Sequence, residues 1–316
     1  MSVDDLSLDA IRAARERIAP YVHTTPIVTM THLGLNLKAE SLHPTGAFKV
    51  RGAFNALLTL APSDTRRRVV THSSGNHAQA LAYAAAKLNM RAVVIIPETA
   101  APTKIEAARR WGAEVVLVSP LGQDRYEACD RFVREEGAIL VPPFDSSTIM
   151  AATGTIGLEI IEQVPNVNCV LVPVAGGGLI GGIAAAIVQS RPNIRVIGVE
   201  PMLADDATQS FRAGSIVEID PQQALRTIAD GLRTARLGEK TWPVIRKFVS
   251  DIVSVPEGAI RAAVKDVFAE ARLVAEPSGA VAIAGMRAAR ANPKHTVAVL
   301  SGGNVAPEDF RGLLAA

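Results

Sequence analysis

The sequence CVLVPVAGGGLIGGIAAAIV, residues 169–188, is the stretch that decides the fold. It contains no charged residue over 20 positions, a length sufficient to cross a bilayer. Pro173 and the glycines at 176–178 nevertheless divide it into a short β-branched run and a longer run rich in Ala and Ile. That pattern is typical of a buried strand, a tight turn and a helix. We therefore predict a strand–turn–helix unit of an α/β protein here, and no membrane span.

The same alternation of short apolar runs and helical patterns continues in both directions along the chain, and it is typical of parallel sheets covered by helices. The predicted strands are 69–71, 92–96, 114–118 and 139–141 in a first series, and 170–172, 195–199 and 297–300 in a second. We predict an α/β fold of two doubly wound parallel-sheet domains. The small domain spans 67–145, and the large domain combines 1–66 with 146–316.

Composition and charge exclude several classes of function. The 316 residues suffice for two domains, and 33 basic against 31 acidic side chains leave a net charge of +2. With aromatic residues at 4% there is no basic, aromatic-rich face, so we predict no nucleic-acid partner. Cys129 and Cys169 lack metal-ligand spacing and are predicted to be reduced core residues. Residues 1–9 lack the apolar stretch of a secretory signal, so we expect a cytoplasmic protein.

The sequence VPVAGGGL, residues 172–179, forms a glycine-rich loop between the predicted strand and helix. Free N–H groups at a helix start suit a phosphate group, and glycine lets the backbone close around it. Gly176, Gly178 and Gly181 also satisfy the dinucleotide fingerprint, with Glu200 near the place of a ribose-binding acid. From these residues alone, a dinucleotide, a simpler phosphate and a purely structural turn all stay open.

Lys49 ends the sequence PTGAFK, residues 44–49, at the start of a helical pattern. Because a helix N-terminus and Arg51 are close by, we expect the pKa of its amine to be lowered, as a Schiff-base lysine requires. Position alone would more often indicate an exposed lysine.

Two further loops follow predicted strands, where ligands bind in open α/β sheets. The sequence SSGNH, 73–77, offers small donors at a helix start, so a helix cap and a carboxylate site are both open. The amide of Asn76 can reach a phenolic oxygen. Ser301, in SGGN at 301–304, can bond a ring nitrogen, although a tight turn is the commoner role of such a sequence.

Taken together, these four loops resemble those of the fold-type II pyridoxal-phosphate enzymes, in the threonine/serine dehydratase and serine racemase branch. The resemblance extends from Thr25-Pro26 through Ala229-Asp230-Gly231 and Glu276-Pro277-Ser278 to the SGGN loop. It implies a tryptophan synthase β-like fold with pyridoxal 5′-phosphate between the two domains. It also implies a small amino-acid substrate and a homodimer.

The resemblance assigns roles to individual residues. Lys49 becomes the Schiff-base lysine and general base, and Ser74 a catalytic residue on the opposite face of the cofactor. The cofactor-binding residues become Phe48, Lys49, Asn76, Ala175, Gly176, Gly177, Gly178, Gly231 and Ser301, and the substrate-binding residues Ser73, Ser74, Gly75, Asn76 and His77. Glu200, Ala204 through its carbonyl, and Asp206 match a Mg²⁺ or Ca²⁺ site, whose oxygen ligands suit a hard cation.

The implied reaction is β-elimination from a small hydroxy amino acid such as threonine or serine, giving a 2-keto acid and ammonia. A serine at the ring nitrogen favours prompt elimination, because unlike a carboxylate it does not hold that nitrogen protonated. Ser74 can return a proton to Cα, so a serine or other amino acid racemase is an alternative. Ala175, residues 151–155 and Pro44 depart from the family pattern, which leaves a 3-hydroxyaspartate dehydratase open as well. An NAD-dependent oxidoreductase and a non-catalytic binding protein are the alternatives from other classes.

Overall fold

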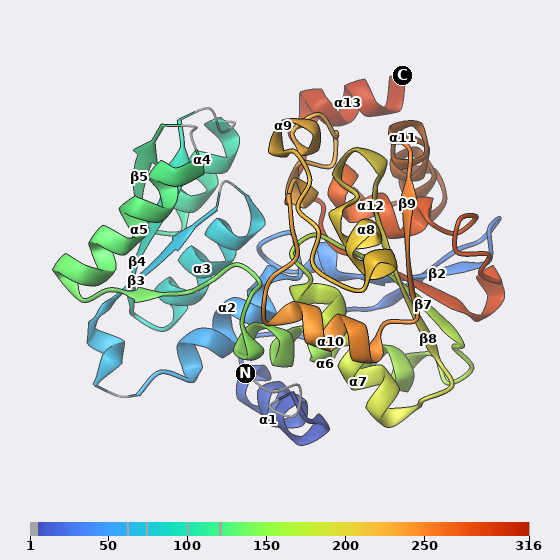
Figure 1. The fold of residues 1–316 in the computed structure, drawn as a ribbon, viewed down its shortest axis with the longest axis horizontal. Coiled ribbons are helices and arrows are strands. Elements are labelled where there is room, and N and C mark those ends of the chain that lie inside the picture. The colour runs from blue at the N-terminus through green and yellow to red at the C-terminus, as the bar shows by residue number, and fades with distance from the viewer. Residues whose placement is uncertain are drawn as a thin grey trace.

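The computed structural model describes residues 6–61, 63–73, 75–98, 100, 102–119 and 122–315. They form two sheets, each covered by helices, that lie side by side (Figure 1). The larger sheet contains β1 (Ile27–Met30), β2 (Leu35–Ala39), β10 (Thr296–Leu300), β7 (Cys169–Pro173), β8 (Arg195–Pro201) and β9 (Asp251–Val255), in that spatial order. The smaller contains β5 (Glu114–Val118), β4 (Arg91–Pro97), β3 (Arg68–His72) and β6 (Ile139–Leu140).

All neighbouring strands are parallel except β1, which pairs antiparallel with β2 at the edge of the larger sheet. The small unit has the helices α3 (Asn76–Lys87), α4 (Pro102–Arg110) and α5 (Gly122–Glu136). The other helices are α1 (Leu8–Ile18), α2 (Lys49–Leu58), α6 (Ser147–Gln163), α7 (Gly178–Ser190), α8 (Asp206–Ala213), α9 (Pro221–Ala224), α10 (Thr241–Phe248), α11 (Glu257–Asp266), α12 (Pro277–Ala284) and α13 (Pro307–Ala315). Single turns are η2 (Glu40–Leu42), η3 (Asp64–Arg66), η4 (Met202–Ala204), η5 (Asp230–Leu232), η6 (Val267–Ala271) and η7 (Pro293–His295).

Strand β7 is apolar throughout because helices cover both faces of its sheet. Side chains alternate along a strand, and Val170 and Val172 accordingly join the core beside α6 and α7, whereas Cys169 and Leu171 join the core beside α12. The continuous apolar run is therefore the signature of a central parallel strand. No helix in the described part of the chain is long and apolar enough to cross a membrane.

The predicted fold class is confirmed, and several predicted elements agree closely with the structure. Strand β5 spans the predicted residues 114–118, and α2 begins at Lys49 itself. The sequence did not predict β2, β9 or the antiparallel β1. The strands of the smaller sheet lie within 67–145, but apolar side chains of α2 join the core of the small unit. We therefore keep the domain bounds as a proposal.

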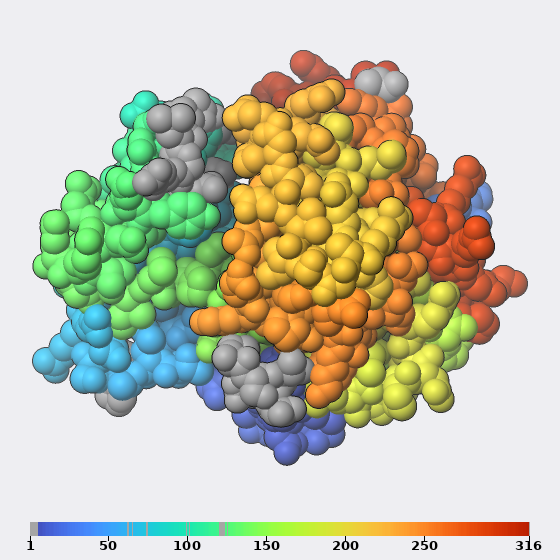
Figure 2. Space-filling model, in the orientation of Figure 1, coloured from blue at the N-terminus to red at the C-terminus, as the bar shows by residue number. Residues whose placement is uncertain are grey.

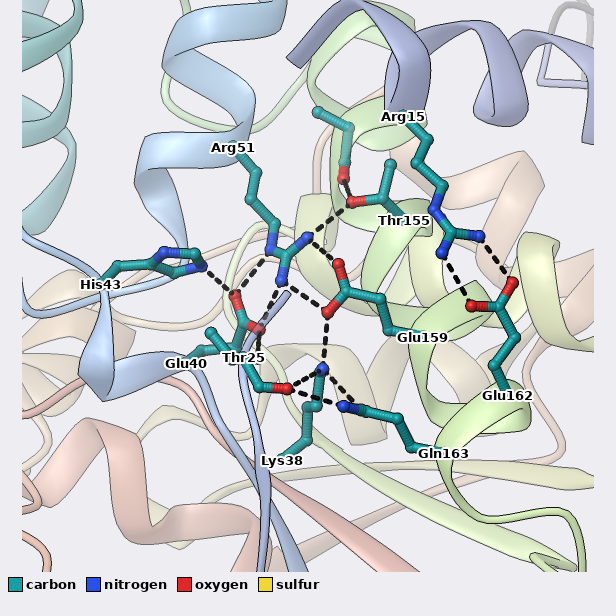
Figure 3. Close-up of polar contacts among 11 residues, drawn as sticks. Arg15, Thr25, Lys38, Glu40, His43, Arg51, Thr155, Glu159, Glu162 and Gln163 are labelled. Carbon is teal, nitrogen blue, oxygen red and sulfur yellow. Dashed lines mark hydrogen bonds and ion pairs between the residues drawn. The ribbon is translucent and has the colours of Figure 1, made fainter. Parts of the chain in front are cut away.

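A buried ionic network fixes α2 against the larger unit (Figure 3). The Arg51 guanidinium, 1% exposed, bonds to both oxygens of Glu40, at 2.8 and 2.9 Å, and to both oxygens of Glu159, at 2.6 and 2.9 Å. Lys38 adds a second cation, 2.5 Å from Glu159. Two cations therefore balance two carboxylates, and together they join β2, η2 and α6 to the helix that begins at Lys49.

The two units meet along one seam, where the green segment of the small unit abuts the yellow and orange segments of the large one (Figure 2). An ion pair between Lys104 of α4 and Asp230 of η5 crosses this seam. A cavity lined by residues of both units lies between them.

Candidate active site

The four loops predicted from the sequence line one cavity of about 210 Å³. Loops 301–304 and 174–178 follow the ends of β10 and β7, loop 73–75 follows β3, and Lys49 comes after β2 and η2. These strands are parallel within their sheets, so their carboxyl ends meet at a common edge. The topology, rather than any single loop, brings the predicted residues together.

Two of the loops are tied to each other by backbone and side-chain bonds. Phe48 donates to the Ser301 carbonyl at 3.1 Å, and Gly303 donates to the Gly46 carbonyl at 2.9 Å. Asn304 Nδ2 donates to the Thr45 carbonyl at 2.7 Å. The loop that carries Lys49 is therefore held against the loop that carries Ser301.

Lys49 presents its amine to this cavity. Its Nζ donates to the Pro143 carbonyl at 2.7 Å and lies 5.1 Å from the centre of the Phe48 ring. Burial lowers the pKa of Lys49 from 10.5 to about 8. The predicted direction is thus correct, but the predicted cause is wrong, because Arg51 is engaged with two carboxylates and burial alone accounts for the shift.

The glycine-rich loop forms a cradle of free backbone donors at the start of α7. The N–H groups of Gly176, Gly177, Gly178 and Leu179 donate to no residue within the described ranges. Gly177 has a φ of +92°, which favours glycine. A Cβ at Gly176 would overlap the Phe144 ring, and one at Gly178 would lie 2.8 Å from the Phe144 carbonyl oxygen. Free N–H groups at a helix N-terminus, with no side chains in the way, fit a phosphate group.

The loop after β3 offers a second group of donors. Ser73 Oγ accepts from the Gly75 N–H at 3.2 Å, and α3 begins at Asn76. His77 lies 3.2 Å from the Val141 carbonyl, and burial, aided by the charge of Lys49, lowers its pKa to about 3. His77 is therefore neutral, and positive charge at this loop comes from the helix start and from Lys49. Ser74, the predicted second catalytic residue, lies outside the described residues.

The remaining predicted cofactor residues also line the cavity. Ser301 is 6% exposed, and Ala175 lies at the start of the cradle. Gly231 lines the cavity too, but its N–H already donates to Ser278 Oγ at 2.8 Å. Residues 151–155 are buried inside α6 and do not line the cavity, so a direct effect of this segment on substrate choice is not supported.

Four charged residues of the cavity wall had no predicted role: Lys104, Asp230, Arg233 and Glu276. Glu276 is 3% exposed and accepts a 2.6 Å bond from Asn76 Nδ2. Burial, together with the charge of Asp230, raises the pKa of Glu276 to about 7. The motifs containing Asp230 and Glu276 were visible in the sequence, but only the fold shows that they meet α3 and α4.

The predicted cation site lies apart from the cavity. The Glu200 carboxylate accepts from Thr208 N at 2.5 Å and from Ala207 N at 3.3 Å, so it faces α8 and not a ribose position. Both carboxylate oxygens of Asp206 are buried without a hydrogen-bond partner in the described structure. Burial raises the pKa of Glu200, and the charge of Asp206 raises it further. Burial also raises the pKa of Asp206, to about 8. Two buried carboxylates lacking a positive partner fit a hard cation. The described residues hold no cluster of three His, Cys, Asp or Glu ligands, so the Ala204 carbonyl would have to contribute.

Comparison with known proteins identifies the family. The model of the pyridoxal-phosphate dependent enzymes matches residues 18–302. The chain belongs to this family. Serine racemase of Arabidopsis thaliana is 40% identical over 309 residues, covering 94% of this chain and 92% of that protein. L-threonine ammonia-lyase of Geobacter sulfurreducens is 39% identical over 319 residues, covering 97% and 79%.

A solved structure agrees with this assignment. Maize serine racemase superposes with a TM-score of 0.91 at 37% identity and covers 98% of this chain and 97% of its own. The cofactor of this enzyme is therefore pyridoxal phosphate, and its fold is that of the fold-type II enzymes. The dinucleotide alternative is set aside.

Proposed function

We propose that this pyridoxal-phosphate enzyme removes the β-hydroxyl group of a small hydroxy amino acid such as threonine or serine. The products are a 2-keto acid and ammonia: water leaves across Cα–Cβ, and one water is consumed when the C–N bond is hydrolysed. The observation that carries the proposal is the meeting of Lys49, the glycine cradle and Ser301 in one cavity.

We assign the cofactor phosphate to the N–H groups of residues 176–179, because they are free and lie at the N-terminus of α7. Asn76 is the partner of the 3′-oxygen and Ser301 that of the ring nitrogen. Lys49 is the residue that holds the cofactor. When bound, pyridoxal phosphate withdraws electrons from Cα of an amino acid and so makes the Cα proton acidic.

Lys49 is the proposed base for that proton. With a pKa of about 8, a substantial fraction of its amine is neutral near physiological pH. The Pro143 carbonyl, 2.7 Å from Nζ, keeps the amine at the cavity wall. The N–H groups at the start of α3 receive the substrate carboxylate, and the neutral His77 leaves that loop without a further cation.

Ser301 supports elimination over a long-lived carbanion. A hydroxyl group carries no negative charge at neutral pH and so does not hold a ring nitrogen protonated. Negative charge at Cα is then weakly stabilised, which favours prompt departure of the β-hydroxyl.

Serine racemase is the second candidate, because the Arabidopsis relative and the maize structure both carry that name. Racemisation requires an acid on the face of Cα opposite Lys49, a role for which Ser74 is the candidate. The homodimer and the cytoplasmic location stay predictions.

A keto-acid assay combined with chiral analysis tests the proposal across serine, threonine and 3-hydroxyaspartate, with and without Mg²⁺. We expect 2-keto acid from threonine or serine in excess of any D-enantiomer. Accumulation of D-serine with little keto acid would establish the racemase instead. Turnover of 3-hydroxyaspartate alone would move the substrate to that amino acid.

A further inference from the structure

Glu276 is a buried carboxyl group at the cavity wall for which the proposed chemistry has no use. Glu276 occupies the N-cap position of α12 but makes no side-chain capping bond there, and its Oε1 accepts from Asn76 Nδ2 at 2.6 Å. The bond joins the two units, because Asn76 begins α3 of the small one. Gly302 makes room for it: a Cβ there would overlap Glu276 Oε1 and lie 3.1 Å from Asn76 Nδ2.

The hydrogen bonds on either side of Asn76 determine which way its amide faces. The Thr45 carbonyl can only accept, so Asn304 presents Nδ2 to it at 2.7 Å. The second hydrogen of Asn304 Nδ2 goes to Asn76 Oδ1, at 2.8 Å. Asn76 Nδ2 is left facing Glu276, whose Oε1 accepts from it at 2.6 Å. The Thr45 carbonyl at one end of this series of hydrogen bonds and Glu276 at the other therefore fix the orientation of both amides.

A count of donors shows what Asn76 offers to the cavity. Its amide has two N–H bonds and one carbonyl oxygen. One N–H is engaged by Glu276, and the oxygen is engaged by Asn304. The other N–H has no partner among the described residues, and Asn76 lines the cavity. Asn76 therefore presents an N–H donor to the cavity. An oxygen atom with partial negative charge requires such a donor.

We propose that Glu276 is a positioning residue: its carboxyl group holds the Asn76 amide so that an N–H remains available to the 3′-oxygen of the cofactor. The inference rests on the role given to Asn76 under the proposed function. It does not depend on which amino acid is the substrate or on how it reacts.

Replacing Glu276 has consequences that depend on the replacement. With alanine, Asn76 Nδ2 loses its acceptor, and the amide is free to turn its oxygen towards the cavity. An amide oxygen would repel the cofactor oxygen. With glutamine, an acceptor oxygen of similar reach is retained without the charge. Glu276→Gln is therefore the matched control for Glu276→Ala.

The test is a titration of apoenzyme with pyridoxal phosphate, followed by the visible absorption maximum of the product. For Glu276→Ala we expect binding weaker by about tenfold, the scale of one hydrogen bond to a charged group, and an absorption shift in the direction given by Asn76→Ala. Glu276→Gln should stay within about threefold of the wild type, with little shift. Because the two residues act in series, adding Glu276→Ala to Asn76→Ala should change neither quantity further.

The outcomes separate this inference from the proposed function. Additive effects in the double variant, or equal shifts from Ala and Gln at position 276, would overturn the positioning role. An Asn76→Ala variant with wild-type affinity and spectrum would remove the role of Asn76 itself, and this inference with it. Should Glu276→Ala fail to fold, Glu276→Asp shortens the side chain by one methylene group and withdraws the acceptor from Asn76 Nδ2, and wild-type affinity with an unshifted absorption maximum there would also overturn the proposal.

Discussion

Lys49 carries its amine into the cavity between the two units, where burial lowers its pKa to about 8. An ordinary lysine amine, with a pKa of 10.5, is almost wholly protonated at neutral pH and is then no nucleophile. We expect the rate at which the apoenzyme takes up pyridoxal phosphate to rise as pH increases through about 8, since only the neutral amine reacts. Stopped-flow absorption measures this rate, and a midpoint near the ordinary lysine value would contradict the burial of the amine.

Replacement of the same residue tests its part in catalysis. Lys49→Ala should lose at least about 10²–10⁴-fold in turnover, the range for a positioned base. Lys87→Ala, which changes an exposed lysine of α3, is the control and should retain the wild-type rate. Borohydride treatment followed by peptide mass analysis should find the cofactor on residue 49 of the wild type. A Lys49→Ala enzyme of unchanged turnover would exclude the proposed role.

Asp206 offers a separate prediction, because its two buried oxygens have no partner in the described structure. Its pKa is raised from 3.8 to about 8, so folding favours the protonated form, and its contribution to stability is lost as pH rises from about 4 to about 8. A bound cation would reverse that loss. We expect Mg²⁺ to raise the melting temperature of the protein more at pH 8.5 than at pH 6, and to have little effect on Asp206→Asn. Equal shifts in the two proteins would place the cation elsewhere.

At the scale of elements, the position of α2 depends on the Arg51 network (Figure 3). Removing one member of a buried ion pair leaves uncompensated charge, and without Arg51 the single cation Lys38 would face the two carboxylates Glu40 and Glu159. We expect Arg51→Met to lower the free energy of unfolding by about 3–5 kcal/mol, measured by urea denaturation.

Arg15 provides the matched control for Arg51. It pairs with Glu162 at 2.6 Å, but both side chains are part-exposed, at 39% and 53%. Arg15→Met should therefore cost at most about 1 kcal/mol. Equal losses from the two substitutions would show that burial does not set the strength of the network.

At the scale of the whole molecule, the cavity lies between two units, and both members of the Lys104–Asp230 ion pair line it. Both side chains are partly exposed, so the pair contributes about 1 kcal/mol or less to the contact between the two units. We expect Lys104→Met to raise the KM for the amino-acid substrate by up to about fivefold, because it weakens the contact between the units that bound the cavity. An unchanged KM would show that the pair has no influence on substrate binding.

The sequence by itself determined the fold class and most of the candidate site. Continuous apolar runs such as 169–173 identify strands buried on both faces, and the segments that follow them contain Asn76, the glycine cradle and Ser301, whereas Lys49 was found from its own local sequence. These are local properties, since strand pattern, turn chemistry and helix starts are written within a few residues.

Only the tertiary structure decided what depends on contacts between distant segments. Glu276 meets Asn76 across 200 positions of sequence, and Lys104 meets Asp230 across 126. The cause of the Lys49 pKa shift likewise belongs to the fold, because its neighbour in sequence, Arg51, is engaged with Glu40 and Glu159, and burial does the rest. Burial and pairing follow from how the two units close on each other, and a linear sequence does not record that arrangement.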